Sequence, residues 1–176
     1  MANDKTVIVH DERLRGCVHA PGQAVFPVNQ DVGLRALVAN LSAACQQGEF
    51  RMIVLCHGNK DKGLQLCQEN LTLETVNLLA PLRGFFSRGV MLNACQAARG
   101  NGTFLCGRIA SVMAAPVEAS ARNQNSDLFP IDGVLYFSET RWQGQVYTWD
   151  ECGTLLGKRR VGRKAKEDWI VPPFDE

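Results

Sequence analysis

The feature that most constrains the fold is an alternation of apolar, strand-like runs with helix-like segments between residues 5 and about 120. Residues 51–56 (RMIVLC) form a nearly continuous apolar run, which is typical of a strand covered on both faces of a parallel sheet. Residues 5–9, 89–93 and 116–120 are further strand candidates. This order predicts an α/β protein with right-handed crossovers, a mostly parallel central sheet and three α/β/α layers.

Three segments between these strands carry helix signals. The first spans residues 31–47, with Asp31 as its N-cap and Gly48 after its end. The second spans residues 72–80 and begins at a capping Thr72. The third follows a glycine-bearing loop at residues 99–102, and its apolar face consists of Leu105, Ile109, Val112 and Met113.

The last third of the chain has a different pattern. Residues 134–137 and 145–149 indicate two strands around a turn at Gly144, which predicts a C-terminal β-hairpin. Residues 158–166 (KRRVGRKAK) are basic, and the chain ends in DWIVPPFDE. A length of 176 residues fits one domain. We therefore expect a single domain with a core at residues 5–150 and a basic, proline-containing tail at residues 151–176.

Charge and cysteine content exclude several classes of protein. The formal net charge of +1 argues against a dedicated nucleic-acid or membrane-surface binder, since both need a basic excess. Seven cysteines without a CxxC pair indicate a reduced, cytoplasmic protein rather than a disulfide scaffold. Three dispersed histidines give no metal-ligand spacing, so we expect neither a metal nor an organic cofactor.

Two short segments contain the candidate catalytic residues, and each segment comes directly after an apolar strand. Leu55-Cys56-His57-Gly58 follows the first of these strands, and Asn93-Ala94-Cys95-Gln96 follows the second, 38 residues later. Residues beyond the carboxyl ends of neighbouring parallel strands share one crevice. There an imidazole can take the proton of a thiol nucleophile and later protonate a leaving amine. The backbone N–H groups of Gly58 and Cys95 are candidates for an oxyanion hole.

These motifs resemble the caspase-like cysteine peptidases (clan CD). An apolar strand ending in His-Gly is followed by a helix and by an apolar strand ending in Ala-Cys. The stretch GLQLCQENLTLETVNLLAPLRG followed by GVMLNACQAA is most similar to the bacterial CHAT-type domains of that group. The resemblance covers about residues 50–120 well and the N-terminal strand and helix loosely. The Gln-Ala-Cys-x-Gly motif of caspases is not reproduced, because the chain has Asn93-Ala94-Cys95-Gln96-Ala97.

The resemblance implies a caspase-like sandwich in which His57 is the general base and acid and Cys95 the nucleophile. The substrate would be a protein or peptide, held by the loop after the first strand and by the loop after residues 116–120. Charged or polar candidates for the pocket of the P1 side chain, the one before the cleaved bond, are Asp11, Glu12, Arg13, Ser120, Arg122, Asn123 and Asp127. Both signs of charge occur among them, so the preferred P1 residue stays open.

Two other functions fit the same residues. The domain is a silent or latent relative that binds a peptide or a regulatory partner protein without cutting it, or it is a thiol hydrolase that acts on another amide or ester. An open crevice with the thiol and the imidazole facing one another favours catalysis over binding.

Overall fold

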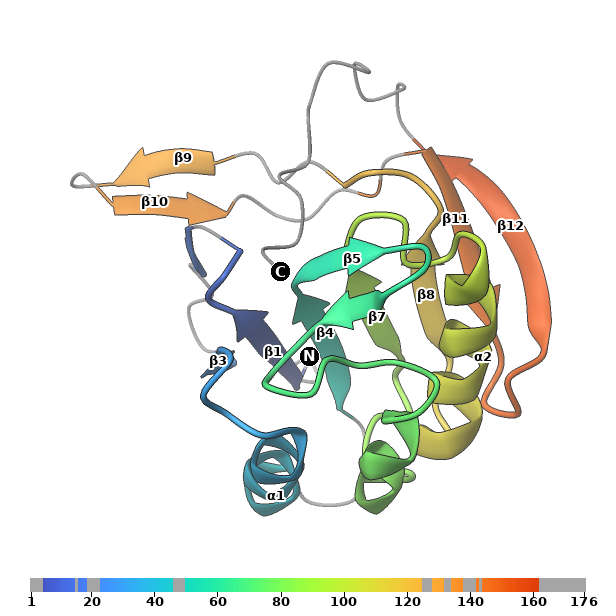
Figure 1. Ribbon diagram of the computed structural model, residues 1–176, viewed down its shortest axis with the longest axis horizontal. Coiled ribbons are helices and arrows are strands. Elements are labelled where there is room, and N and C mark those ends of the chain that lie inside the picture. Colours follow the sequence, from blue (N-terminus) through green and yellow to red (C-terminus); the bar gives the residue numbers. More distant parts are fainter. Residues whose placement is uncertain are drawn as a thin grey trace.

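The computed structural model describes residues 5–14, 16–18, 23–45, 50–124, 128–131, 134–137, 142 and 144–161. A seven-stranded sheet forms the centre of this part of the chain (Figure 1). Its strands in spatial order are β12 (Leu155–Val161), β11 (Gly144–Trp149), β8 (Val117–Ser120), β7 (Val90–Asn93), β4 (Arg51–Leu55), β1 (Thr6–Asp11) and β3 (Ala24–Val28). Among the five strands β8, β7, β4, β1 and β3, neighbours pair in parallel. β11 pairs antiparallel with both β8 and β12. The predicted mostly parallel α/β architecture is confirmed.

The helices connect successive parallel strands. α1 (Leu34–Ala44) joins β3 to β4, the 3₁₀ helix η1 (Val76–Leu82) joins β4 to β7, and α2 (Asn101–Met113) joins β7 to β8. All three crossovers step along the sheet in one direction, so right-handed connections place them on the same face. η1 contacts both α1 and α2. Within the described ranges the helices therefore form one layer on the sheet, and the third layer of the predicted sandwich is not among them.

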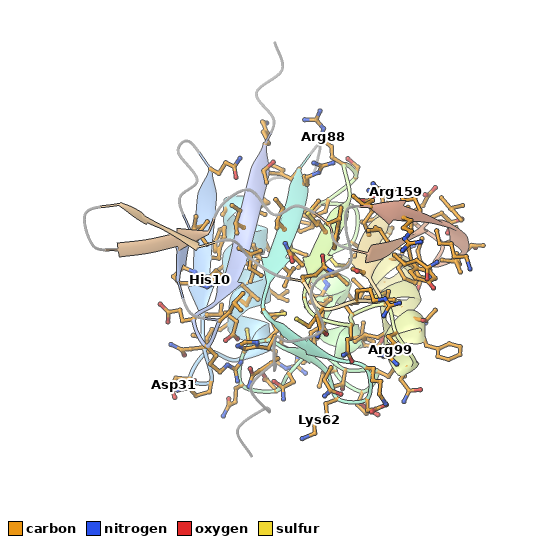
Figure 2. All side chains as sticks on the ribbon, turned by 90° about the horizontal axis from the view of Figure 1, so that it is seen from above. His10, Asp31, Lys62, Arg88, Arg99 and Arg159 are labelled. Carbon is orange, nitrogen blue, oxygen red and sulfur yellow. The ribbon has the colours of Figure 1, made fainter. Side chains whose placement is uncertain are left out.

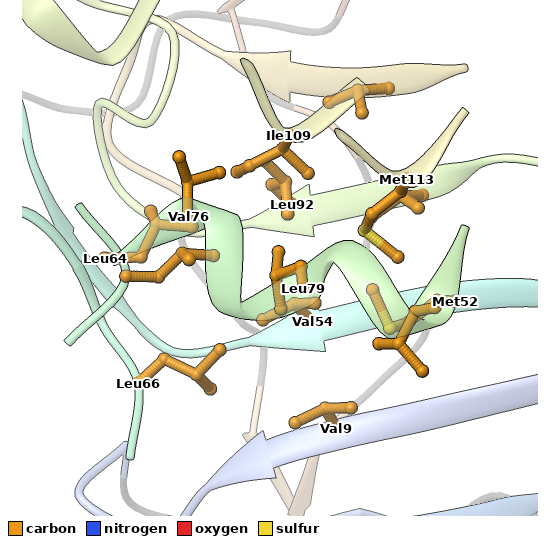
Figure 3. Packing of buried hydrophobic residues seen from close by; sticks show 14 of the residues in the cluster. Val9, Met52, Val54, Leu64, Leu66, Val76, Leu79, Leu92, Ile109 and Met113 are labelled. Atoms are coloured by element: carbon orange, nitrogen blue, oxygen red, sulfur yellow. The ribbon is translucent and has the colours of Figure 1, made fainter. Parts of the chain in front are cut away.

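Alternate residues of the central strands form the core under this helical layer. Val54 of β4 pairs with Val9 on one side and with Leu92 on the other. Figure 3 shows these side chains pointing toward Leu79 of η1 and Ile109 of α2. All five are buried. The parallel register thus lines up apolar side chains across the face of the sheet that lies under the helices.

The first helix begins later than predicted. Asp31 is exposed and is not the N-cap, because α1 begins after Gly33. The first N–H of the helix, on Leu34, instead donates to the Glu69 carboxylate at 2.8 Å. A carboxylate from a distant loop satisfies the helix N-terminus as well as a local cap does, so the local signal at Asp31 was misleading.

The second predicted helix is shorter and of a different type. Thr72 does not begin an α-helix, because its N–H donates to the Thr75 hydroxyl at 2.9 Å and that hydroxyl donates to the Asn70 carbonyl at 2.7 Å. The 3₁₀ helix η1 starts only at Val76 and includes Pro81. Side-chain bonds to the backbone compete with α-helical bonds, and Pro81 cannot donate one.

The predicted C-terminal hairpin has the right strands but the wrong pairing. β10 (Val134–Phe137) pairs with β9 (Leu128–Ile131) and β2 (Cys17–Val18) in a separate sheet. β11 pairs with β8 and with β12. The sequence assigned residues 155–161 to the tail, but in the structure they form β12, an edge strand of the central sheet. Figure 2 shows Arg159 of β12 on the opposite side of the sheet from His10 of β1. Strand partners depend on distant segments, which local alternation does not specify.

A smaller hairpin lies next to the carboxyl end of the sheet. β5 (His57–Asn59) pairs antiparallel with β6 (Gly63–Gln65). Across the described ranges, the helices are all too short or too polar to cross a membrane.

The core around Leu92 is the first place to test this fold. Leu92 is 1% exposed, so Leu92→Ala leaves a cavity between the sheet and the helices. We expect the free energy of unfolding to fall by about 2–5 kcal/mol. The matched control is Leu156→Ala, since Leu156 on β12 is 66% exposed and its loss should change stability by less than about 0.5 kcal/mol. Urea unfolding measures both, and equal losses would contradict this fold.

Candidate active site

His57 and Cys95 follow two neighbouring strands. β4 and β7 pair in parallel with Leu55 beside Asn93, so each of the two residues lies two positions beyond a paired residue. Parallel strands end at the same edge of a sheet. In Figure 1, β5, which starts at His57, lies across the ends of β4 and β7. The register therefore brings the two segments to one edge.

Gly58 shows how closely the two segments approach. A Cβ atom built on Gly58 would lie 2.9 Å from the Ala94 Cβ and 3.1 Å from the Cys95 nitrogen, and it would overlap the Cys95 carbonyl oxygen. Glycine is thus required because the backbone after His57 lies directly on the turn that contains Cys95. The missing side chain of Gly58 thus makes room for the backbone of Cys95.

His57 is held by a backbone carbonyl. Its side chain is half-buried, and Nε2 donates to the carbonyl oxygen of Arg13 at 3.2 Å. A carbonyl only accepts hydrogen bonds, so Nε2 carries the proton and Nδ1 of the neutral ring is an acceptor. The Arg13 carbonyl therefore leaves Nδ1 as the ring nitrogen that is able to accept a proton.

The Cys95 turn is fixed to the end of β8. The N–H of Gln96 donates to the Arg122 carbonyl at 3.0 Å, and that of Ala98 donates to the Ser120 carbonyl at 2.9 Å. Gln96 itself has a φ of 54°, a left-handed conformation that is strained for a residue with a Cβ.

The Cys95 thiol is held in its neutral form. Sγ donates to the Gln124 carbonyl at 3.6 Å, and burial raises the pKa of the Cys95 thiol above its ordinary value. At neutral pH the thiolate is therefore scarcer than in an exposed cysteine. Nucleophilic attack then requires a base that removes the proton during the reaction.

Two backbone N–H groups are available beside the thiol. Leu64 exchanges both of its backbone hydrogen bonds with Leu71, so its pairing with Gly58 across the hairpin carries no hydrogen bond. The Gly58 N–H consequently points away from β6. The Cys95 N–H has no backbone acceptor within the described part of the chain. Both groups are backbone donors of the kind that an oxyanion hole uses.

Asp11 and Arg13, expected in a substrate pocket, are bound to each other. Asp11 is fully buried, and its carboxylate accepts from Arg13 Nε at 2.7 Å and from Nη2 at 2.6 Å. The Asp11 hydrogen bond raises the pKa of the Arg13 guanidinium. In this arrangement the two charges offset each other, and the Asp11 carboxylate is bound within the chain. Glu12, by contrast, is exposed and accepts from Asn29 at 3.0 Å.

The remaining pocket candidates have different surroundings. Ser120 is buried, and its hydroxyl donates to the Gln145 carbonyl at 3.2 Å. Arg122 is exposed, with its aliphatic part over Gly144. Asn123 accepts from the Gln96 amide at 3.0 Å. Asp127 lies outside the described residues. Among the described candidates near the Cys95 turn, Arg122 therefore presents the exposed charge.

The sequence did not reveal the carbonyl groups that orient the two reactive side chains. Arg13 and Gln124 contribute only their backbone oxygens to His57 and Cys95. Every residue carries such an oxygen, so no pattern of residue types could indicate these positions.

No set of three or more histidine, cysteine or acidic side chains converges to hold a metal in the described ranges. No family model, curated protein or solved structure matches this chain. The likeness to caspase-like peptidases therefore rests on the sequence motifs alone.

The contact at Gly58 is testable by a single methyl group. Gly58→Ala must displace the Cys95 turn, because a Cβ there overlaps the Cys95 carbonyl oxygen. We expect a loss of about 1–3 kcal/mol in the free energy of unfolding. Gly157→Ala is the control, since a Cβ at Gly157 meets no atom within 4 Å. Urea unfolding measures the free energy of unfolding of both variants. An unchanged free energy of unfolding in Gly58→Ala would show that β5 does not lie on this turn.

The protonation of Cys95 predicts its reactivity toward alkylating reagents. Because burial raises its pKa, the alkylation rate should rise with pH and reach half its maximum above about 8.5, the value of an ordinary thiol. The rate is followed by mass spectrometry of the Cys95 peptide, with a short synthetic peptide of the same sequence as reference. A midpoint below that of the reference would mean that a pre-formed thiolate–imidazolium pair outweighs burial.

Proposed function

We propose that the protein is a cysteine endopeptidase with His57 and Cys95 as its catalytic pair. The observation that carries the proposal is the meeting of two strand ends, with Leu55 and Asn93 in register and Gly58 packed on the Cys95 backbone. This juxtaposition puts a base and a thiol from distant parts of the sequence at one edge of the sheet. The motif resemblance to caspase-like peptidases supports the same reaction.

The reaction proceeds through an acyl-enzyme. Sγ of Cys95 attacks the carbonyl carbon of the cleaved peptide bond while Nδ1 of His57 takes the thiol proton. The N–H groups of Gly58 and Cys95 donate to the oxyanion of the tetrahedral intermediate. His57 then gives its proton to the leaving amine, and a thioester remains. Water, deprotonated by His57, hydrolyses the thioester, and Cys95 regains a proton.

A latent form of the domain is the second candidate. The raised pKa of Cys95 and its hydrogen bond to the Gln124 carbonyl favour a resting thiol over an activated one. A partner or substrate that displaces the Gln124 carbonyl would free Sγ for attack. The same domain would then bind a peptide or a regulatory partner before, or without, cutting it.

The substrate would be an extended protein or peptide segment. Among the described pocket candidates near the Cys95 turn, the exposed charge belongs to Arg122, which favours an acidic side chain close to the cleaved bond. Six cysteines are unpaired, namely Cys45, Cys56, Cys67, Cys95, Cys106 and Cys152, which supports our proposal of a reducing, cytoplasmic setting.

Cleavage of a peptide library tests the peptidase proposal. The wild type should cut a subset of peptides, enriched in acidic residues before the cleaved bond. Cys95→Ala and His57→Ala should lower kcat/KM by at least about 10³-fold, as loss of one member of a catalytic pair does.

The matched control for the thiol is Cys152→Ala, because Cys152 is exposed in the turn between β11 and β12. Its activity should equal that of the wild type. Binding of a peptide by the wild type without cleavage would instead support the latent form. Equal cleavage by the wild type, Cys95→Ala and His57→Ala would refute the catalytic pair.

A further inference from the structure

Asp11 has no hydrogen-bonding capacity left for a substrate. It ends β1, and its side chain is 1% exposed. Besides the two guanidinium bonds, its carboxylate accepts from the N–H of Arg13 at 3.2 Å and from the N–H of Cys67 at 3.1 Å. Four donors therefore surround two carboxylate oxygens. A buried charge with this many partners has a structural or positioning task rather than a recognition task.

Arg13 extends this contact to the hairpin that carries His57. Its Nη2 donates to the Cys67 carbonyl at 2.8 Å, so both backbone groups of Cys67 are bound by the Asp11–Arg13 pair. Cys67 follows β6, and Gln65 of β6 pairs with His57. Burial and the Asp11 charge raise the pKa of the Cys67 thiol to about 12, which keeps this cysteine neutral within the cluster. The pair thus ties the end of β1 to the His57 hairpin.

The same pair shapes the turn that presents the Arg13 carbonyl. The N–H of Leu14 donates to the Asp11 carbonyl at 2.9 Å, and the N–H of Arg13 donates to the Asp11 carboxylate. These two bonds define a tight turn closed by an aspartate side chain. Arg13 is therefore held to Asp11 by its backbone and by its side chain, and its carbonyl oxygen points at His57 Nε2, 3.2 Å away.

We propose that Asp11 is a positioning residue for His57, acting through Arg13. By fixing the Arg13 carbonyl, it keeps the imidazole in the tautomer with the proton on Nε2, so that Nδ1 faces the reaction as a base. This role replaces the substrate-binding role that the sequence suggested for both residues. Its catalytic meaning rests on the proposed peptidase function, but the tautomer of His57 is a property of the protein without substrate.

Asp11→Asn is the direct test. The amide has the size of the carboxylate but no charge. Its NH₂ group replaces one of the two accepting oxygens, so that the donors bound to that oxygen lose their acceptor. In ¹⁵N NMR spectra at a pH where the ring is neutral, the wild type should show His57 protonated on Nε2. The variant should show a mixture of both tautomers. Its kcat should fall about 10- to 100-fold, as for loss of other partners that orient a functional histidine, with KM within about twofold of the wild type.

Asp61→Asn is the matched control. Asp61 is an exposed carboxylate in the turn of the same hairpin, where it pairs with Lys60. It should leave the tautomer and kcat unchanged. A merely structural role for Asp11 predicts loss of folded protein in Asp11→Asn with a normal His57 tautomer in the folded remainder, and that result would overturn the proposal.

Arg13→Lys covers the case in which Asp11→Asn does not fold. Lysine keeps the positive charge beside Asp11 but cannot bind both the carboxylate and the Cys67 carbonyl as the guanidinium fork does. It should move the tautomer in the same direction, and an unchanged tautomer would contradict the proposal. If the wild type shows the Nε2–H tautomer but cuts no peptide, the peptidase function fails while the positioning role stands.

Discussion

The parallel register between β4 and β7 is the constraint on which the rest of the site depends. It sets Leu55 beside Asn93, and the two segments that follow then meet with Gly58 against the backbone of Cys95. A shift of the register by one residue would turn the inward side chains of one strand, Val54 or Leu92, out of the core and displace the two strand ends relative to each other. The apolar contacts under the helices therefore specify the site as well as the fold, because the same pairing serves both.

The polar groups around the site act mostly on one another. Asp11 and Arg13 neutralise each other below the surface, and the thiol of Cys95 donates to the chain's own Gln124 carbonyl. Each contact satisfies a buried group that would otherwise destabilise the folded state. These contacts also leave the Cys95 thiol neutral and the Asp11 and Arg13 charges bound to each other. A peptidase with such a site would depend on the imidazole, and on displacement of the Gln124 carbonyl, to become reactive.

Elements whose sequence pattern lies within their own segment were predicted correctly, and elements that depend on distant residues were not. The strands at β1, β4, β7 and β8 and the helices α1 and α2 were predicted from runs and spacings within their own segments. The errors came where a distant group intervened. Glu69 rather than Asp31 accepts the first N–H of α1, and β11 found β8 and β12 instead of β10. Pairing and capping across the chain are decided by three-dimensional proximity, which a local pattern does not contain.

By itself the sequence determined the residue types of the candidate site. Apolar runs define where the strands end, and His57 and Cys95 follow two of those ends, so the two side chains of the proposed chemistry could be named in advance. Only the tertiary structure decided what surrounds them. The Arg13 carbonyl on His57, the Gln124 carbonyl on Cys95 and the closed Asp11–Arg13 pair all involve backbone atoms or long-range partners. Backbone atoms are the same in every residue, so their roles arise only when folding brings them within hydrogen-bonding distance of a side chain.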